Sequence, residues 1–87
     1  MPIGNLKHQI NRLPKHPGVY LYSNRAGDTI YIGKARTLRD RVRSYATAYG
    51  ASPRLDALLE EIAGLEVIIT DSVVEALALE NHLIKQR

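Results

Sequence analysis

Two short stretches of alternating residues, joined by a turn-rich segment, constrain the fold of this 87-residue chain most strongly. Residues 18–22 and 29–33 each alternate between aliphatic side chains and tyrosine, glycine or threonine. Because successive side chains of a β-strand point to opposite faces, both stretches have an aliphatic side and a tyrosine side. Residues 23–28 are rich in turn-forming types. We therefore predict a β-hairpin with one face made of tyrosines.

The simplest pairing of the two strands sets Tyr22 opposite Thr29, and hence Tyr20 opposite Tyr31. Side chains that face each other across a strand pair have Cβ atoms about 5 Å apart. A slip of one residue would set tyrosine against isoleucine on mixed faces. We therefore expect a site lined by phenols rather than an ordinary apolar core.

The length and composition favour one small domain over residues 1–87. A chain of this size buries roughly 60% of its unfolded surface, which allows one core and one site. It contains no cysteine, so disulfides and thiolate metal sites are excluded, and no apolar run approaches the roughly 18 residues of a membrane span. We expect a cytoplasmic protein with no membrane association. The last predicted helix lacks a stop signal, so we expect the chain to be the front piece of a longer protein.

The charge is distributed unevenly along the chain. Residues 1–54 contain ten Lys and Arg against two Asp, a balance of +8, whereas residues 55–87 contain two against seven acids, a balance of −5. The densest stretch holds five cations within ten residues: Lys34, Arg36, Arg39, Arg41 and Arg43. Such a run is often only a solvated helix face, but its position directly after the second tyrosine strand favours a surface for a polyanion.

The remaining periodicity predicts helices around the hairpin. Apolar residues at helical spacing indicate a short helix before Pro14, a helix from residue 37 and a helix over 53–63. Residues 65–70 form an apolar, β-branched run typical of a strand. A last helix over 73–85 is apolar nearly all round, so we expect it to lie buried at the centre of the domain.

Arg41 differs from its basic neighbours in its helical position. With Leu38, Val42 and Tyr45 as the inward stripe, Arg41 lies on the edge of that stripe. An arginine held there is costly unless it meets an anion such as a phosphate in its transition state, although a snorkelling side chain or an acidic partner would also explain it. Three other arginines are better explained as contacts to the phosphates of a nucleic acid: Arg36, Arg39 and Arg43.

Glu75 has two possible roles. Residues 72–75 form a capping box, in which Glu75 closes the start of its helix, and this reading alone accounts for the residue. A lone carboxylate that opens an apolar helix could also hold a hard divalent ion that keeps several waters. Glu80 lies about 140° round the helix and His82 about 10.5 Å along it, so neither is a good second ligand.

Other kinds of site are absent from the sequence. It has no phosphate-binding glycine loop, no Gly-x-Ser-x-Gly elbow, no cysteine nucleophile and no close carboxylate pair. Tyrosines, arginine, lysine and one glutamate remain, and this set suits hydrolysis of a phosphodiester, in which a water is activated and a pentavalent phosphate is stabilised.

The order and spacing of these residues closely resemble the GIY-YIG nuclease family, and most of all its UvrC branch. The matching strings are Gly18-Val19-Tyr20, Tyr31-Ile32-Gly33-Lys34-Ala35, Arg41, Tyr45 and residues 75–81. Two positions depart from the family pattern: Val19 replaces an isoleucine, and His82 stands where asparagine is usual. The resemblance implies an α/β (α+β) fold with a small three-stranded antiparallel sheet flanked by helices. It also implies one divalent cation, Mg²⁺ or Mn²⁺, held by Glu75.

The resemblance further implies roles for the site residues. Tyr31 would activate the attacking water with support from Tyr20, Arg41 would stabilise the phosphate, and Lys34 and Tyr45 would position or polarise groups around it. The implied function is a metal-dependent DNA endonuclease that makes the 3′-side incision in nucleotide excision repair with a UvrB-like partner. Two alternatives stay open from the residues: another branch, such as a homing or structure-specific nuclease, and a nucleic-acid-binding module without catalysis.

Overall fold

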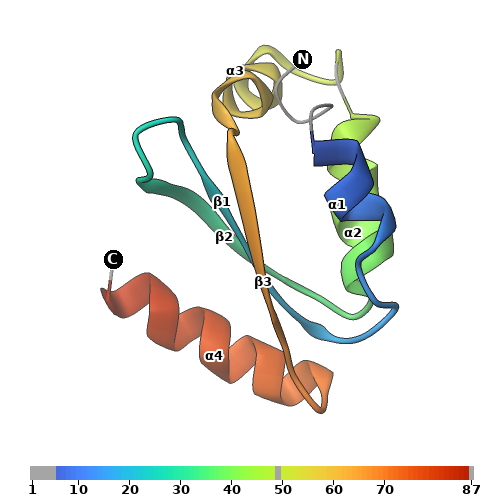
Figure 1. Cartoon of the computed structure of the whole chain (residues 1–87). Coiled ribbons are helices and arrows are strands. Elements are labelled where there is room, and N and C mark those ends of the chain that lie inside the picture. The colour runs from blue at the N-terminus through green and yellow to red at the C-terminus, as the bar shows by residue number, and fades with distance from the viewer. Residues whose placement is uncertain (1–5, 49, 87) are drawn as a thin grey trace.

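A three-stranded antiparallel sheet with helices on both faces forms the fold, as the computed structural model shows for residues 6–48 and 50–86 (Figure 1). The strands lie in the order β2-β1-β3, so that β1 is central and β2 is an edge strand. The predicted fold class is therefore confirmed. None of the helices in these two ranges is long and apolar enough to cross a membrane. The elements are α1 (Lys7–Asn11), β1 (Gly18–Ser23), β2 (Thr29–Ala35), α2 (Leu38–Ala46), α3 (Pro53–Glu61), β3 (Gly64–Ile69) and α4 (Val73–Gln86).

The hairpin forms as predicted, but the predicted register is wrong by two residues. Tyr22 pairs with Tyr31, and Tyr20 pairs with Gly33. A shift of two keeps every side chain on its predicted face, so the tyrosine face survives the correction. A Cβ atom at Gly33 would collide with the Tyr20 ring and hydroxyl. The glycine therefore leaves the space into which the Tyr20 ring extends.

The loop between β1 and β2 explains the different register. The Asn24 backbone N–H donates to Asp28 O (2.9 Å), and the Asp28 backbone N–H donates to Asn24 Oδ1 (3.0 Å). Gly27 takes a positive φ of 91°, which glycine adopts without strain. A bulge next to Ser23 then absorbs one extra residue before the regular pairing begins. Local hydrogen bonds of the turn thus set the register, and strand alternation alone does not reveal them.

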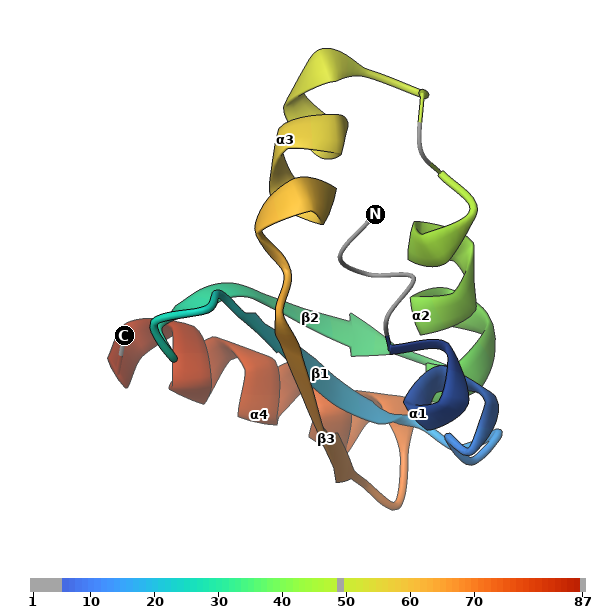
Figure 2. The ribbon, with the colours of Figure 1, turned by 45° about the horizontal axis from the view of Figure 1, so that its top comes forward.

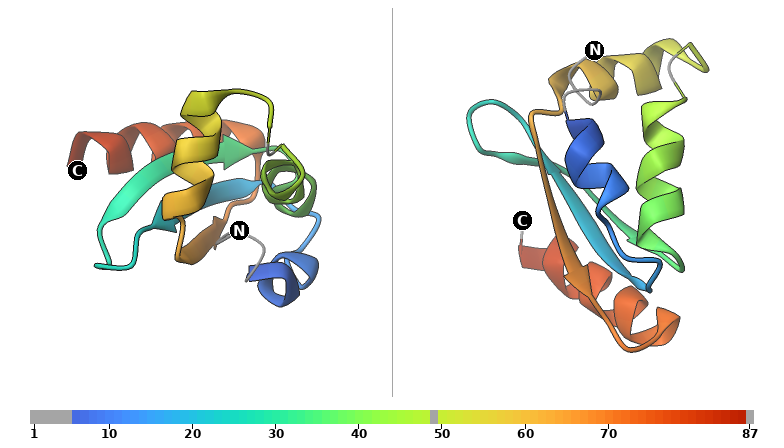
Figure 3. Two further views of the ribbon diagram at one scale, coloured as in Figure 1. Left: turned by 90° about the horizontal axis from the view of Figure 1, so that it is seen from above. Right: turned by 45° about the vertical axis from the view of Figure 1, so that its right-hand side comes forward.

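The two faces of the sheet are covered differently. α1, α2 and α3 lie on the tyrosine face, and α4 lies along the opposite face (Figures 2 and 3). The tyrosine face carries the larger buried cluster, whose members are Ile10, Leu13, Tyr20, Tyr22, Ala35, Leu38, Val42, Leu59, Ile62 and Leu65. The opposite face buries Val19, Leu21 and Ala76 against Ile32, Leu79 and Leu83. Alternation along β1 and β2 supplies both faces from the same strands.

α2 and α3 begin where the sequence predicts. Leu38 and Val42 on α2 are buried, as their spacing indicated. At the start of α3, the Leu55 backbone N–H donates to Ser52 Oγ (3.1 Å), and Pro53 occupies the first turn. The Ser52 hydroxyl pairs one of the free N–H groups of the helix start, and proline has no N–H that would need a partner. These two helices therefore frame the tyrosine face.

The prediction that α4 is the buried centre of the domain is wrong. Only Ala76 on this helix is buried, whereas Val74 is 78% exposed and Ile84 is 51% exposed. α4 packs on β1 and β2 through one stripe, and no described element covers its outer side. The apolar residues all round α4 therefore belong to two stripes: an inner one that packs on the sheet and an outer one that faces away from it.

Candidate active site

Four tyrosines from three elements pack together on one face of the sheet. Tyr20 and Tyr22 come from β1, Tyr31 from β2 and Tyr45 from α2. Their ring centroids are 5.5–6.2 Å apart, within the range of favourable aromatic contact. Hydrogen bonds join Tyr20 Oη to Tyr45 Oη (3.4 Å) and Tyr45 Oη to Tyr31 Oη (3.2 Å). The structure thus brings together the three predicted tyrosines and adds Tyr22.

The four phenols differ in their access to solvent. Tyr20 is 1% exposed and Tyr22 is fully buried, whereas Tyr31 is 37% exposed. A substrate can therefore reach the Tyr31 hydroxyl but not that of Tyr20. Tyr20 stacks on the Tyr31 ring (centroids 6.1 Å apart) and also bonds to Tyr45, so it is a positioning residue for the exposed phenol.

The surroundings raise the pKa values of the cluster. Burial is the largest cause of the raised pKa values of Tyr20 and Tyr22. For Tyr31, its hydrogen bond with Tyr45 raises the pKa first and partial burial adds to this, while Arg41 opposes the shift. Since even an ordinary phenol has a pKa of about 10, Tyr31 needs a cation close by to accept a proton at neutral pH.

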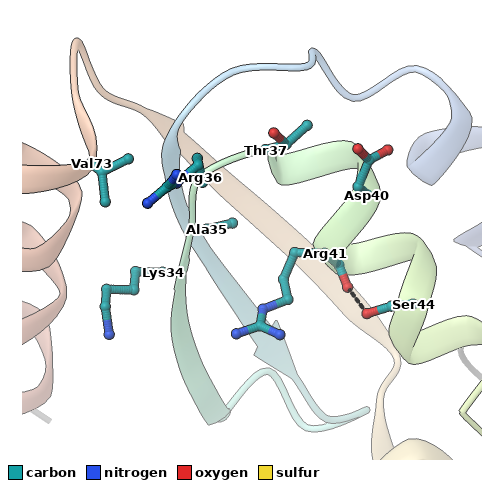
Figure 4. A pocket seen from close by; sticks show the side chains of 8 residues that line it. All are labelled: Lys34, Ala35, Arg36, Thr37, Asp40, Arg41, Ser44 and Val73. Atoms are coloured by element: carbon teal, nitrogen blue, oxygen red, sulfur yellow. Dashed lines mark hydrogen bonds between the residues drawn. The ribbon is translucent and has the colours of Figure 1, made fainter.

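A cationic groove runs beside β2, between the start of α2 and the start of α4. It has a volume of about 470 Å³, and Lys34, Arg36 and Arg41 line it (Figure 4). Asp40 is the one acidic residue of its lining. The Arg41 guanidinium points towards β2, while the Arg41 backbone carbonyl accepts a hydrogen bond from Ser44 Oγ (2.6 Å) (Figure 4). The groove therefore presents three cations to an anionic ligand.

Two of the three arginines predicted to contact DNA are engaged elsewhere. Arg39 is half-buried, and its Nε donates to Leu13 O (2.7 Å). Arg43 Nη2 donates to Asn11 Oδ1 (3.1 Å). Both interactions tie α2 to α1 or to the segment that follows it. The basic stretch is therefore divided between the groove and helix packing, because consecutive helical positions point in different directions.

The structure does not bring Glu75 to the other predicted site residues. Its backbone N–H donates to Ser72 Oγ (3.1 Å), as in the predicted capping box, and its side chain is exposed. Glu80, by contrast, has a side chain only 15% exposed, and its Oε1 lies 3.7 Å from Lys34 Nζ. Since Glu75 lies about 140° round α4 from Glu80, it faces away from Lys34 and β2.

The sequence does contain a signal that marks Glu80 as a candidate site residue. It follows Ala76 by four residues and precedes Leu83 by three, so it lies at the edge of the stripe that packs on the sheet. A carboxylate is seldom held beside an apolar stripe without a charged partner or a function. Reasoning from the sequence judged Glu80 only as a second ligand beside Glu75 and so discarded it.

Glu80 fits the needs of a magnesium or manganese site. Mg²⁺ keeps several waters and binds proteins through one or two carboxylates. No group of three or more His, Cys, Asp or Glu that could hold a metal occurs in residues 6–48 and 50–86. A single partly buried carboxylate beside Lys34, open to solvent along the sheet edge, matches a hydrated ion rather than an all-protein cage.

Known proteins closely similar to this chain share its pattern. Residues 16–87 match the UvrC-like GIY-YIG domain. UvrABC system protein C of Chlorobaculum tepidum is 55% identical over 82 residues, which cover 93% of this chain and 13% of that protein. UvrABC system protein C of Methanococcus maripaludis is 47% identical over 77 residues, 88% of this chain and 15% of that protein. The chain thus spans a small part of the length of these relatives.

Solved structures agree with the sequence relatives. The GIY-YIG N-terminal endonuclease domain of UvrC from Thermotoga maritima, bound to its catalytic divalent cation, magnesium, superposes with a TM-score of 0.82 at 38% identity. The match covers 94% of this chain and 89% of that domain. Three variants of the same domain with one tyrosine changed to phenylalanine are also bound to the divalent cation. The predicted resemblance is confirmed, and the chain belongs to the UvrC-like GIY-YIG domain family.

Proposed function

We propose that this chain is a metal-dependent endonuclease that hydrolyses a phosphodiester bond of DNA. The observation that carries the proposal is the gathering of three kinds of group at the edge strand β2. Tyr31 contributes an accessible phenol, Arg41 a guanidinium beside it, and Lys34 contacts the partly buried carboxylate of Glu80. Phosphodiester hydrolysis needs such a set: a proton acceptor, a charge stabiliser and a metal ligand.

We assign the metal to Glu80 in place of Glu75. Glu80 is close to Lys34, whereas Glu75 lies on the other flank of α4. A bound Mg²⁺ or Mn²⁺ supplies a Lewis acid for phosphate oxygens and lowers the pKa of a water ligand. The tyrosine variants of the Thermotoga domain that are bound to the cation are consistent with a carboxylate as the main protein ligand.

In this proposal, some side chains transfer or position protons and others stabilise negative charge. Tyr31 Oη takes the proton of the attacking water after giving up its own proton, a loss that the nearby cations would favour, and Tyr45 Oη donates a hydrogen bond that holds the Tyr31 oxygen in place. Tyr20 restrains Tyr45 in turn. Arg41 opposes the rise in the pKa of Tyr31 and stabilises the charge that develops on the phosphate oxygens. Lys34 holds the Glu80 carboxylate and polarises the neighbouring phosphate.

Of the arginines first assigned to DNA, Arg36 is the one we retain as a backbone contact. It lines the groove with Lys34 and Arg41. Arg39 and Arg43 hold α2 against its neighbours, so we assign them a packing role. Since phosphate contacts position the strand without reading its sequence, the groove implies little base specificity.

The relatives indicate the pathway in which this activity operates. Their name places them in a UvrABC system. We propose that the chain forms the 3′-side incision module of nucleotide excision repair, acting in the cytoplasm with a UvrB-like partner.

Manganese binding tests the proposal without requiring turnover. Mn²⁺ is titrated into the chain and paramagnetic broadening of backbone amide signals is followed for wild type, Glu80→Gln and Glu75→Gln. We expect broadening at β2 and the middle of α4 in wild type and in Glu75→Gln, and its loss in Glu80→Gln. Glu75→Gln leaves the start of α4 intact and serves as the matched control. Broadening that is lost only in Glu75→Gln restores Glu75 as the ligand, and no specific broadening in any of the three favours a binding module without catalysis.

A further inference from the structure

A second hollow opens on the other side of the exposed tyrosine. It has a volume of about 370 Å³ and lies between the tyrosine cluster and the start of α3. Tyr31 and Tyr45 form one wall, and residues of α3 and its cap form the other: Ser52, Arg54, Leu55 and Leu58. The hollow therefore shares the Tyr31 side chain with the proposed site, although none of the α3 residues has a role there.

Arg54 is the one cation of this hollow, and it is available to a ligand. Its side chain is exposed and forms no ion pair or hydrogen bond with the described residues. Leu58 follows it by four residues, so both lie on the same side of α3. Asp56 and Glu60 lie about 200° and 240° round the helix from Arg54, and the Asp56 carboxylate accepts the Gly50 backbone N–H (2.8 Å). Glu61 lies on the same side of α3 as Arg54 but about 10.5 Å further along the helix axis, too far for an ion pair. Arg54 therefore has no acidic partner among the described residues.

The hollow continues the line of the cationic groove. Arg41 of the groove and Tyr45 of the hollow are four residues apart on α2, about 6 Å along its axis. α3 lies beyond the far end of α2, above the tyrosine face (Figure 2). The groove with Arg36 and Arg41 and the hollow with Tyr31 and Arg54 therefore adjoin each other at α2. The hollow combines a cation, two phenols and aliphatic side chains, as a nucleotide requires for its phosphate and its sugar or base.

We propose that the α3 hollow binds the nucleotide next to the scissile phosphate, with Arg54 on its backbone phosphate and Leu55 and Leu58 against its sugar. This inference rests on the proposed endonuclease function, since it assumes a DNA strand that crosses Tyr31. The strand is held by cations on both sides of the reacting phosphate, in the groove and at α3. Arg54 is then a substrate-binding residue from a part of the chain outside the basic stretch.

The salt dependence of DNA binding tests this inference. Binding of a duplex oligonucleotide is measured by fluorescence anisotropy in EDTA, so that no cleavage occurs, over a range of KCl concentrations. The variants are Arg54→Gln, Arg54→Lys, Arg36→Gln and Arg25→Gln. Arg25 is an exposed arginine of the hairpin loop, remote from the site, and serves as the matched control. Each lost phosphate contact on duplex DNA makes the log-log slope shallower by about 0.9.

We expect a slope shallower by about 0.9 for Arg54→Gln and Arg36→Gln, and a wild-type slope for Arg54→Lys and Arg25→Gln. A wild-type slope for Arg54→Gln with a shallower one for Arg36→Gln overturns the α3 site and leaves the endonuclease proposal intact. Equal changes for Arg54→Gln and Arg25→Gln also overturn it, because they indicate diffuse charge. Unchanged slopes for both Arg36 and Arg54 variants overturn the whole DNA path, the groove included.

Discussion

The two faces of the sheet use the same strands for different purposes. The tyrosine face is closed by α1, α2 and α3 over a large aromatic cluster, whereas the opposite face is covered by α4 alone over aliphatic side chains. The first face supplies Tyr31, and the second supplies Lys34 and Glu80. Alternation along β2 points Tyr31 and Lys34 to opposite faces. The proposed chemistry therefore lies at the edge where the two faces meet.

Removing the Glu80 carboxylate should have the largest effect on DNA cleavage, because Glu80 is the metal ligand that the face covered by α4 contributes to the proposed site. We expect Glu80→Gln to lower kcat/KM for DNA cleavage in Mg²⁺ about 10³-fold, since metal stabilisation of the transition state contributes several kcal/mol. Cleavage of a supercoiled plasmid provides the measurement. Glu75→Gln should stay close to wild type, and an equal loss in both variants would contradict the assignment.

Alkaline pH should lower the free energy of unfolding through the buried phenols of the tyrosine face. The raised pKa values of Tyr20 and Tyr22 mean that the folded protein keeps two protons that the unfolded chain releases above about pH 10. Stability is therefore unaffected by these groups below pH 10 and falls above it, by up to about 2.7 kcal/mol per pH unit for two phenols.

Urea unfolding between pH 9 and pH 11 measures this loss. Tyr22→Phe should make the pH dependence clearly smaller, because one of the two buried phenols is no longer present to ionise in the unfolded chain. A variant with the same slope as wild type would show that Tyr22 is not protected in the folded state.

A methyl group at Gly33 should disturb the tyrosine face by steric overlap. The added Cβ would meet the Tyr20 ring, which is held by its neighbours, so Gly33→Ala should cost about 1–3 kcal/mol of unfolding free energy. Gly64→Ala is the matched control in β3, because its Cβ would meet only the Ser23 side chain, which can turn away. Comparable losses in the two variants, measured by urea denaturation, would argue against a specific role for Gly33.

The smallest effect should be a gain in stability from Tyr22→Phe. The Tyr22 hydroxyl is buried and has no hydrogen-bond partner among the described residues, and a buried unpaired polar group costs about 1–3 kcal/mol. We expect a gain of about 1 kcal/mol, seen as a Tm rise of about 4–8 °C near neutral pH. Tyr20→Phe should lack this gain because its hydroxyl bonds to Tyr45, and a Tm fall in Tyr22→Phe would refute the prediction.

The sequence predicts the elements and the two faces well, since these follow from periodicity. The inward stripe of α2 and the start of α3 at Pro53 both occur as predicted. The hairpin register was wrong because the Asn24–Asp28 hydrogen bonds and a bulge decide it, and alternation is the same for any shift of two residues.

The site was harder to predict than the fold. The tyrosines and Arg41 could be placed from strand and helix spacing, but the choice between Glu75 and Glu80 depends on which flank of α4 meets β2. Helical spacing gives the angle between the two residues and leaves the orientation of the helix on the sheet open. The Lys34–Glu80 contact, which joins residues 46 positions apart, shows that the Glu80 flank of α4 faces β2, and our assignment of the metal to Glu80 rests on it.

The edge position of β2 has a consequence for how water is controlled. A site enclosed by protein expels solvent when it closes, which strengthens its electrostatic interactions. Within residues 6–48 and 50–86 the outer side of β2 pairs with no other strand, so these residues form only part of an enclosure. A DNA strand bound as we propose would add its own sugars and bases to that open edge. Cleavage would then depend on how closely the shape of the substrate matches the edge.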